Sequence, residues 1–146
     1  KDHSQLGVTF SRDQVLSQVG RIPIAVSGVP ALAGRETRIV AFTRLESERE
    51  LLGIRPLLFP LSRSVELIVY RPDGSVEIAG AARNYNTAWE PSYFFKKPIK
   101  VPAGSRIEAV AYVQNNDDNR NLEAPIKGLI FNGTVAELVL AERISK

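Results

Sequence analysis

Side chains that could bind a metal or act as a nucleophile are scarce in this sequence of 146 residues. It has no cysteine and no methionine, and His3 is its single histidine. Zinc, iron–sulfur, blue-copper and haem sites built from internal ligands are therefore excluded, because they need imidazole and sulfur ligands that this chain lacks. One conditional site remains. If Lys1 carries a free amine, Lys1-Asp2-His3 supplies the four nitrogens of a square-planar Cu(II) or Ni(II) site.

Hydrolytic catalysis finds equally little support in the residue types. A Ser-His-Asp triad would have to use His3, which lies at the very start of the sequence. No spacing among the sixteen acidic residues nominates a glycosidase pair. The segment Asn115–Asn119 carries oxygen ligands of the kind that calcium binds, but it lacks the spacing and the glycine of an EF-hand. We expect Gln114–Asn121 to be a loop held by hydrogen bonds from side chains to the backbone.

Two groups of aromatic residues have both a binding and a structural interpretation. Tyr85, Trp89 and Tyr93 could form a platform on which a sugar ring stacks, or Trp89 could lie in the core. The segment Tyr93–Lys100 mixes aromatic residues and lysines, as single-stranded nucleic-acid binders do. Its Pro98 favours instead an edge strand whose lysines discourage further pairing, so no nucleic-acid partner is expected.

These side chains need a scaffold, and the dominant hydrophobic period of the sequence is two, which predicts β-strands. The alternation is clearest in Val65–Tyr70 and Arg106–Val113, and Pro72-Asp73-Gly74 predicts a hairpin turn after the first of them. Glu46–Leu52 is the best helical candidate. About eight or nine antiparallel strands, separated by Gly and Pro, predict an all-β jelly roll or β-sandwich. The other predicted strands are Gly7–Phe10, Arg21–Val26, Thr37–Thr43, Ser75–Ala79, Tyr93–Phe95, Leu129–Phe131 and Glu137–Glu142.

Length and composition set further limits. A chain of 146 residues corresponds to a single domain, 1–146, that can bury a core without disulfides. Its formal net charge is +3, and residues of both signs alternate along most of the chain. No apolar run approaches the roughly 18 residues of a membrane helix, so no membrane insertion is expected. Because residue 1 is a lysine, we expect the chain to be processed or excised from a longer one.

An ordered set of motifs extends over nearly the whole chain. The motifs, in order, are Leu6–Phe10, Arg71–Gly74, Asn84-Tyr85-Asn86, Trp89, Tyr93, Lys97-Pro98, Val101–Ile107, Asn115–Asn121, Asn132-Gly133-Thr134 and Glu137. This order resembles the C-terminal domain of the copper type II, ascorbate-dependent monooxygenases, the peptidylglycine alpha-hydroxylating monooxygenase superfamily, and in particular its bacterial members. The resemblance implies a jelly-roll fold and an extracytoplasmic location, periplasmic or secreted.

The same resemblance implies where copper would lie. The family's domain holds its oxygen-activating copper with a His-x-His pair and a methionine, and these positions correspond here to Leu57, Phe59 and Leu138. Hydrocarbon side chains offer copper no lone pair, so the oxygen chemistry of the family cannot run in this chain. The three residues could line a small apolar pocket. We expect instead that they fill the vacated site as part of the core.

We therefore predict a domain that is not an enzyme and that has no cofactor. The expected function is that of a non-catalytic binding or structural module, whose partner is another protein or an adjoining domain of the same chain. Two alternatives remain open. The domain could bind a sugar or a small hydrophobic ligand, in which case Trp89 or Phe59 would be exposed. It could also complete a copper-dependent active site whose metal is supplied elsewhere.

Overall fold

A computed structural model describes residues 16–57, 61–83, 92–120 and 122–144. All regular secondary structure in these residues is β-strand, which confirms the predicted all-β class. The eight strands, in chain order, are β1 (Ser17–Pro30), β2 (Arg35–Arg44), β3 (Arg49–Pro56), β4 (Ser62–Tyr70), β5 (Val76–Arg83), β6 (Tyr93–Val101), β7 (Arg106–Asn115) and β8 (Ile130–Arg143).

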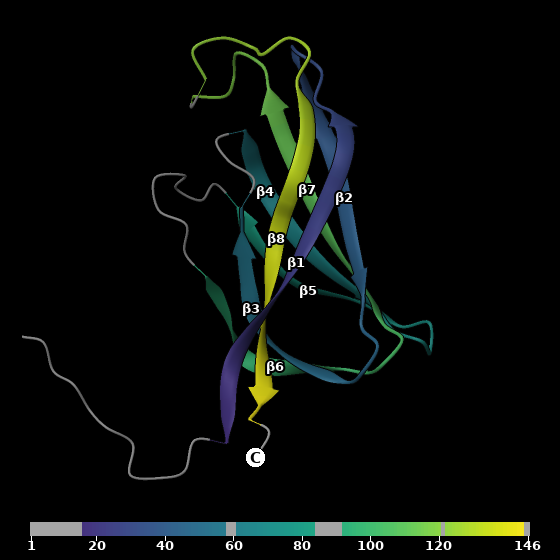
Figure 1. Ribbon diagram of the computed structural model, residues 1–146. Helices are drawn as coiled ribbons and strands as arrows, with labels where there is room; N and C mark the ends of the chain where they lie inside the picture. The colour runs from purple at the N-terminus through teal and green to yellow at the C-terminus, as the bar shows by residue number, and fades with distance from the viewer. Residues whose placement is uncertain (1–15, 58–60, 84–91, 121, 145–146) are drawn as a thin grey trace, which may run out of the picture.

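The strands form two antiparallel four-stranded sheets that pack face to face (Figure 1). Sheet A has the order β1-β8-β3-β6, and sheet B has the order β2-β7-β4-β5. The pairing is nested: β1 pairs with β8, β2 with β7, β3 with β6 and β4 with β5. One long hairpin folded over on itself produces this order, which is that of a jelly roll. The predicted jelly-roll sandwich is therefore confirmed.

The core lies between the two sheets. Its members are the apolar residues that recur at every second position of the strands. Val65, Leu67 and Val69 of β4 point inward and are fully buried, as are Ile107 and Ala109 of β7. The residues between them point to the outer face of sheet B, because successive side chains of a strand alternate between faces. Sheet B therefore has one buried face and one face open to solvent.

The hairpin between β4 and β5 forms at the predicted turn. The amide of Gly74 donates to the carbonyl of Arg71 at 3.0 Å, and the Asp73 carboxylate accepts the amide of Ser75 at 2.8 Å. Gly74 has a φ of +85°, which a residue with a Cβ adopts only at a cost. The hydrogen bonds from Ser75 hold the pKa of Asp73 below its ordinary value.

The predicted helix at Glu46–Leu52 is wrong, because β3 begins at Arg49. An irregularity in the register between Leu51 and Gly53 breaks the alternation of β3, so the sequence shows no clean period of two there. Strand β3 nevertheless pairs with β6 on one side and β8 on the other. Hydrogen bonding on both edges overrides the weak helical propensity of the segment.

Two strands predicted separately, Leu129–Phe131 and Glu137–Glu142, belong to the single strand β8. The Asn132-Gly133-Thr134 segment between them has the composition of a turn, but it continues the strand through a shift of register against β1. Gly133 takes a φ of +133°, and the side-chain oxygen of Asn132 accepts the amide of Gly28 at 2.8 Å. The predicted strand Gly7–Phe10 lies outside the described residues. No helix among the described residues is long and apolar enough to cross a membrane.

Candidate functional site

The structure describes two of the three positions that the resemblance assigns to copper ligands, Leu57 after β3 and Leu138 in β8. Leu138 is fully buried in β8, where it lies opposite Ile22 of β1 and Ile54 of β3. Leu57 follows β3, is partly buried, and donates its amide to the carbonyl of Val135 at 3.0 Å. Phe59 lies outside the described residues. Leu138 and Ile54 are thus members of the hydrophobic core, and Ile22 packs against that core.

The structure describes one of the three residues predicted to form an aromatic platform. Tyr93 begins β6 at the edge of sheet A, where it is partly buried and packs against the core. Tyr85 and Trp89 lie outside the described residues, as does His3. In the ranges that are described, no group of three or more His, Cys, Asp or Glu side chains is placed to hold a metal ion.

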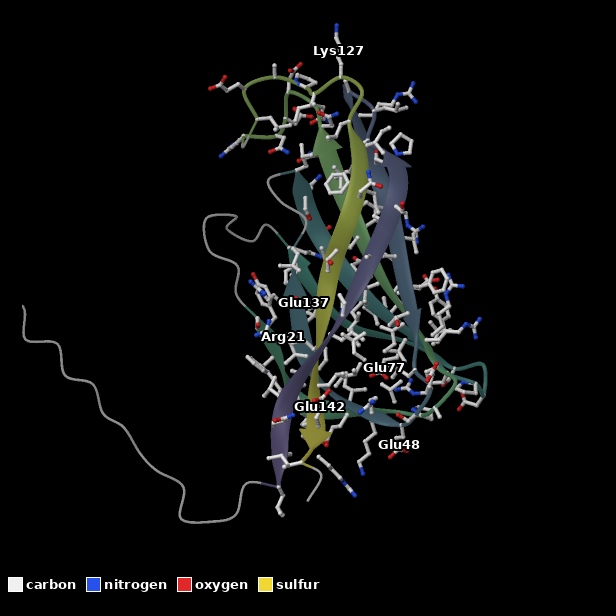
Figure 2. The ribbon with its side chains drawn as sticks, in the orientation of Figure 1. Arg21, Glu48, Glu77, Lys127, Glu137 and Glu142 are labelled. Atoms are coloured by element: carbon white, nitrogen blue, oxygen red, sulfur yellow. The ribbon has the colours of Figure 1, made fainter. Side chains whose placement is uncertain are left out.

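The Asn-rich segment is held by hydrogen bonds from side chains to the backbone, as predicted, but the predicted loop begins too early, because Gln114 and Asn115 belong to β7. Asn115 ends β7 and is fully buried. The side-chain Nδ2 of Asn115 donates to the backbone carbonyls of Ala31 and Ile126, at 2.8 and 2.7 Å. Its side-chain Oδ1 accepts the backbone amide of Ile126 at 2.7 Å. Asn119 donates to the carbonyl of Gln114 at 2.7 Å. These bonds fix the end of the sandwich that Lys127 marks, opposite the end that carries Glu48 (Figure 2).

The outer face of sheet B carries three of the ten large hydrophobic side chains that are exposed in the described part of the chain. Phe42 of β2 and Val76 and Ile78 of β5 are 52%, 57% and 67% exposed. Strand pairing places Phe42 and Ile78 at the two ends of one row of residues, with Glu108 and Ile68 between them. We call the outward-pointing residues of β2, β7, β4 and β5 the sheet B face.

A second row lies beside the first on the same face. It runs from Arg44 through Arg106 and Tyr70 to Val76. The guanidinium carbon of Arg106 lies 4.0 Å from the centre of the Phe42 ring, and its Nη2 lies 2.7 Å from the Glu108 carboxylate. Arg106 is therefore held in place by a cation–π contact and an ion pair at once.

A shallow groove of about 420 Å³ lies at this end of the sheet B face. Tyr70 lies in it next to Glu108. Partial burial, the negative charge of Glu108 and the hydrogen bond to that carboxylate raise the pKa of Tyr70 above its ordinary 10.0. The phenol thus stays protonated and donates to Glu108. The groove is lined by Arg44, Tyr70, Arg71, Pro72, Gly104, Arg106 and Glu108.

Two arginines of β2 lack the ion pairs with described residues that the other arginines of the sheet B face form. Arg63, Arg83 and Arg106 form ion pairs with Glu36, Glu66 and Glu108. Arg38 and Arg44 are exposed and have no ion pair with any described residue. They point outward from β2 on either side of Phe42, since the three positions are an even number of residues apart.

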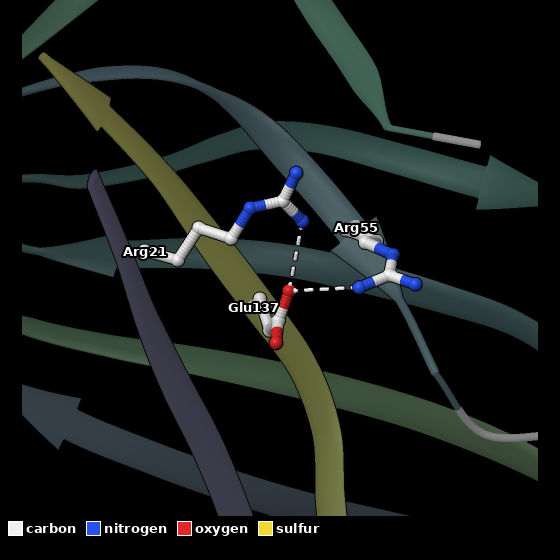
Figure 3. A network of polar contacts seen from close by, with 3 residues as sticks. All are labelled: Arg21, Arg55 and Glu137. Atoms are coloured by element: carbon white, nitrogen blue, oxygen red, sulfur yellow. Dashed lines mark hydrogen bonds and ion pairs between the residues drawn. The ribbon is translucent and has the colours of Figure 1, made fainter. Parts of the chain in front are cut away.

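Sheet A carries a different surface. Arg21 of β1 and Arg55 of β3 both bind one carboxylate oxygen of Glu137 in β8, at 3.0 and 3.3 Å (Figure 3). This network joins three neighbouring strands. The lysines of the sheets all lie in β6, and β6 is an edge strand as the sequence suggested. Lys96, Lys97 and Pro98 are exposed there, a composition that discourages addition of a further strand.

Sequence reasoning missed the sheet B face. The signal that could have revealed it is the alternation in β2, where Arg38, Val40, Phe42 and Arg44 share one side and apolar Ile39 and Ala41 the other. No protein-family model and no curated protein matches this chain. Fold and surface together define an antiparallel jelly-roll β-sandwich with an arginine- and aromatic-bearing outer face.

Proposed function

We propose that this chain is a non-catalytic interaction module that binds an acidic region of another protein on its sheet B face. The observation that carries the proposal is the exposure of Phe42, Val76 and Ile78 on one continuous face. Apolar side chains scattered singly over a surface need no explanation. Here Phe42 lies at one edge of the sheet B face and Val76 and Ile78 lie at the other, so these side chains bound the surface that a partner would cover.

The composition of the face supports a protein partner. Sheet B contains no lysine, and its outward residues include arginines together with Phe42, Tyr70 and Tyr112. Protein interfaces are enriched in aromatic residues and arginine and depleted in lysine. Arginine suits such surfaces because its planar group stacks on aromatic rings and is weakly hydrated.

The charge of the face supports an acidic partner. Arg38 and Arg44 have no counter-charge among the described residues, and they flank the exposed ring of Phe42. A partner segment that presents carboxylates beside an apolar side chain complements this arrangement, and charges of opposite sign also accelerate encounter. A second copy of the chain would bring the same surplus of arginines and is a poorer complement.

The proposal extends to the origin of the domain. Its jelly-roll topology agrees with a copper-less relative of the monooxygenase C-terminal domain, and the core position of Leu138 agrees with a copper site filled by hydrocarbon. In such a relative the binding surface takes over as the functional part of the molecule. An adjoining domain in an extracytoplasmic protein is one partner of the proposed kind.

Selection of a library of random peptides against the intact chain tests the proposed surface. We expect the selected peptides to combine Asp or Glu with large apolar residues. Phe42→Ala should weaken their binding by at least tenfold, since a central aromatic contact of an interface is worth about 2 kcal/mol or more. Phe94→Ala is the matched control: Phe94 is 64% exposed on sheet A, and its loss should leave binding unchanged.

Three outcomes would overturn the proposal. Selection could yield no binders, or binders that Phe42→Ala and Phe94→Ala affect equally. The chain could also form a dimer in light scattering that Phe42→Ala dissociates, in which case a second copy occupies the face.

A further inference from the structure

Two arginines lie directly opposite each other on neighbouring strands at the groove end of the sheet B face. Arg44 of β2 and Arg106 of β7 are direct register partners, and both line the groove. Like charges placed directly opposite each other on one face of a sheet are destabilising. Their juxtaposition is therefore a cost to the fold. Glu108 reduces this cost at Arg106, and an anion bound beside Arg44 would reduce it further.

Among the charged side chains around the groove, one positive charge has no ion-pair partner in the described residues. Arg71 is paired with Glu77, and Arg106 is paired with Glu108. Arg44 has no ion pair with a described residue, so it supplies the surplus positive charge. Within the described chain, the Nε of Arg106 is also buried without a hydrogen-bond acceptor, so the hydrogen-bonding capacity of this guanidinium is incompletely used.

Arg106 is fixed before any ligand arrives. Phe42 covers one face of its guanidinium, and Glu108 holds one of its terminal nitrogens. Tyr70 lines the same groove beside Glu108, and the interaction with that carboxylate contributes to the raised pKa of the phenol. A ligand that binds Arg106 therefore has to order only the exposed side chain of Arg44, which lowers the entropic cost of binding.

We propose that the groove binds a carboxylate group between Arg44 and Arg106. This inference rests on the proposed function and deepens it, because it names the group of the partner that the arginines recognise. A single surplus charge matches a carboxylate monoanion better than a phosphate, which carries close to two negative charges at neutral pH. The planar fork of arginine matches the two oxygens of a carboxylate, and the groove leaves room for the chain that bears it.

Titration of the intact chain with propionate, followed by NMR of the backbone amides and the arginine Nε–H groups, tests the site. Ionic strength is held constant with chloride, because screening alone moves exposed charges. We expect saturable shifts at Gly104 and at the Nε–H groups of Arg44 and Arg106. Arg44→Gln should weaken propionate binding at least fivefold.

Arg35→Gln is the matched control. Arg35 is also exposed on β2, but it lies outside the groove and an odd number of residues from Arg44, so its side chain points from the other side of the strand. Its substitution removes the same charge and should leave propionate binding unchanged. Equal weakening by the two substitutions would show only a general effect of charge and would overturn the site.

A thermal measurement provides a second readout that a merely structural arginine would not produce. Arg44→Gln removes the repulsion of Arg106, so the variant without ligand should melt about 1 to 3 °C higher than the parent chain. Propionate should raise the melting temperature of the parent chain and leave that of the variant unchanged. A variant that melts lower than the parent would contradict the proposal.

Further probes identify the source of the carboxylate. A blocked Ala-Asp-Ala peptide presents a side-chain carboxylate, and an acetylated Ala-Ala-Ala peptide with a free C-terminus presents the end of a chain. Preference for either peptide over propionate names that source, and preference for propionate points to a small organic acid. Tighter binding of inorganic phosphate would overturn the carboxylate assignment. If selected peptides bind the Phe42 surface and propionate does not bind, this inference fails alone.

Discussion

Arg106 and Phe42 form a packed pair on neighbouring strands, with the guanidinium carbon 4.0 Å from the centre of the ring. A contact of this kind at an exposed site contributes about 0.5–1 kcal/mol. We expect Phe42→Leu, which keeps an apolar side chain, to lower the free energy of unfolding by about that amount in urea denaturation. Phe94→Leu should change it by less, because no cation–π contact of Phe94 exists among the described residues. Equal losses would show that the ring contributes only apolar area.

Gly53 and Gly20 make a matched pair for testing how closely the strands of sheet A approach. A Cβ at Gly53 would lie 2.1 Å from the backbone carbonyl oxygen of Tyr93 in β6, whereas one at Gly20 would meet only the side chain of Glu142. Gly53→Ala should therefore separate β6 from β3 and cost about 3 kcal/mol or more, within the range for severe substitutions. Gly20→Ala should cost far less, since Glu142 can turn away. Thermal melting of both variants decides the prediction, and similar losses would refute it.

The turn that ends β4 could be predicted from sequence because its information is local. Asp73 accepts the amide of a residue two positions ahead, and Gly74 supplies the positive φ within the same four residues. Strand β3 could not be predicted in the same way. Its pairing with β6 and β8 depends on residues about 50 and 90 positions away, and the shifted register between Leu51 and Gly53 hides its period.

The candidate site could not be predicted from the sequence for a related reason. Phe42 and Ile78 belong to one row only because β7 and β4 lie between them in the sheet. Period-two alternation predicts which residues of β2 share a face, but not which strands lie beside it. The opposition of Arg44 and Arg106 likewise follows from register between distant strands. Conversely, Tyr85 and Trp89, for which the sequence offers a sugar-stacking interpretation, lie outside the described residues.

Asn115 is predicted to be the polar side chain on which the Lys127 end of the sandwich most depends. It is fully buried and makes three hydrogen bonds to the backbone of Ala31 and Ile126. Asn115→Ala would leave these buried groups without partners, and we expect a loss of about 2–4 kcal/mol in the free energy of unfolding. Asp117→Ala, at an exposed position of the same loop, is the control and should be within about 0.5 kcal/mol of the parent.

Substitution of Leu138 tests whether the position that the resemblance assigns to a copper ligand belongs to the core or lines a pocket. Its complete burial among core residues predicts that Leu138→Ala costs about 2–5 kcal/mol, because a cavity remains. Leu138→Met nearly preserves the volume and should cost about 1.5 kcal/mol or less. Urea denaturation of both variants measures the difference. A Leu138→Ala chain as stable as the parent would indicate an open pocket at this position.

Tyr70 gives the fold a dependence on alkaline pH with a defined sign. Its pKa is raised in the folded state by partial burial and by Glu108, so the folded chain keeps the phenolic proton at a pH where the unfolded chain has lost it. The resulting stabilisation is fully present below the ordinary pKa of 10.0 and declines as the pH rises above it through the folded pKa.

Tyr70→Phe should therefore make the loss of stability above about pH 10 less steep, and it should remove from a spectrophotometric titration a tyrosine whose ionisation is shifted to higher pH. Glu108→Gln provides the control, because removing the carboxylate's charge should bring the ionisation of Tyr70 back toward that of an ordinary tyrosine while keeping the phenol in place. If Glu108→Gln left the ionisation of Tyr70 unmoved, the coupling between Tyr70 and Glu108 would be refuted.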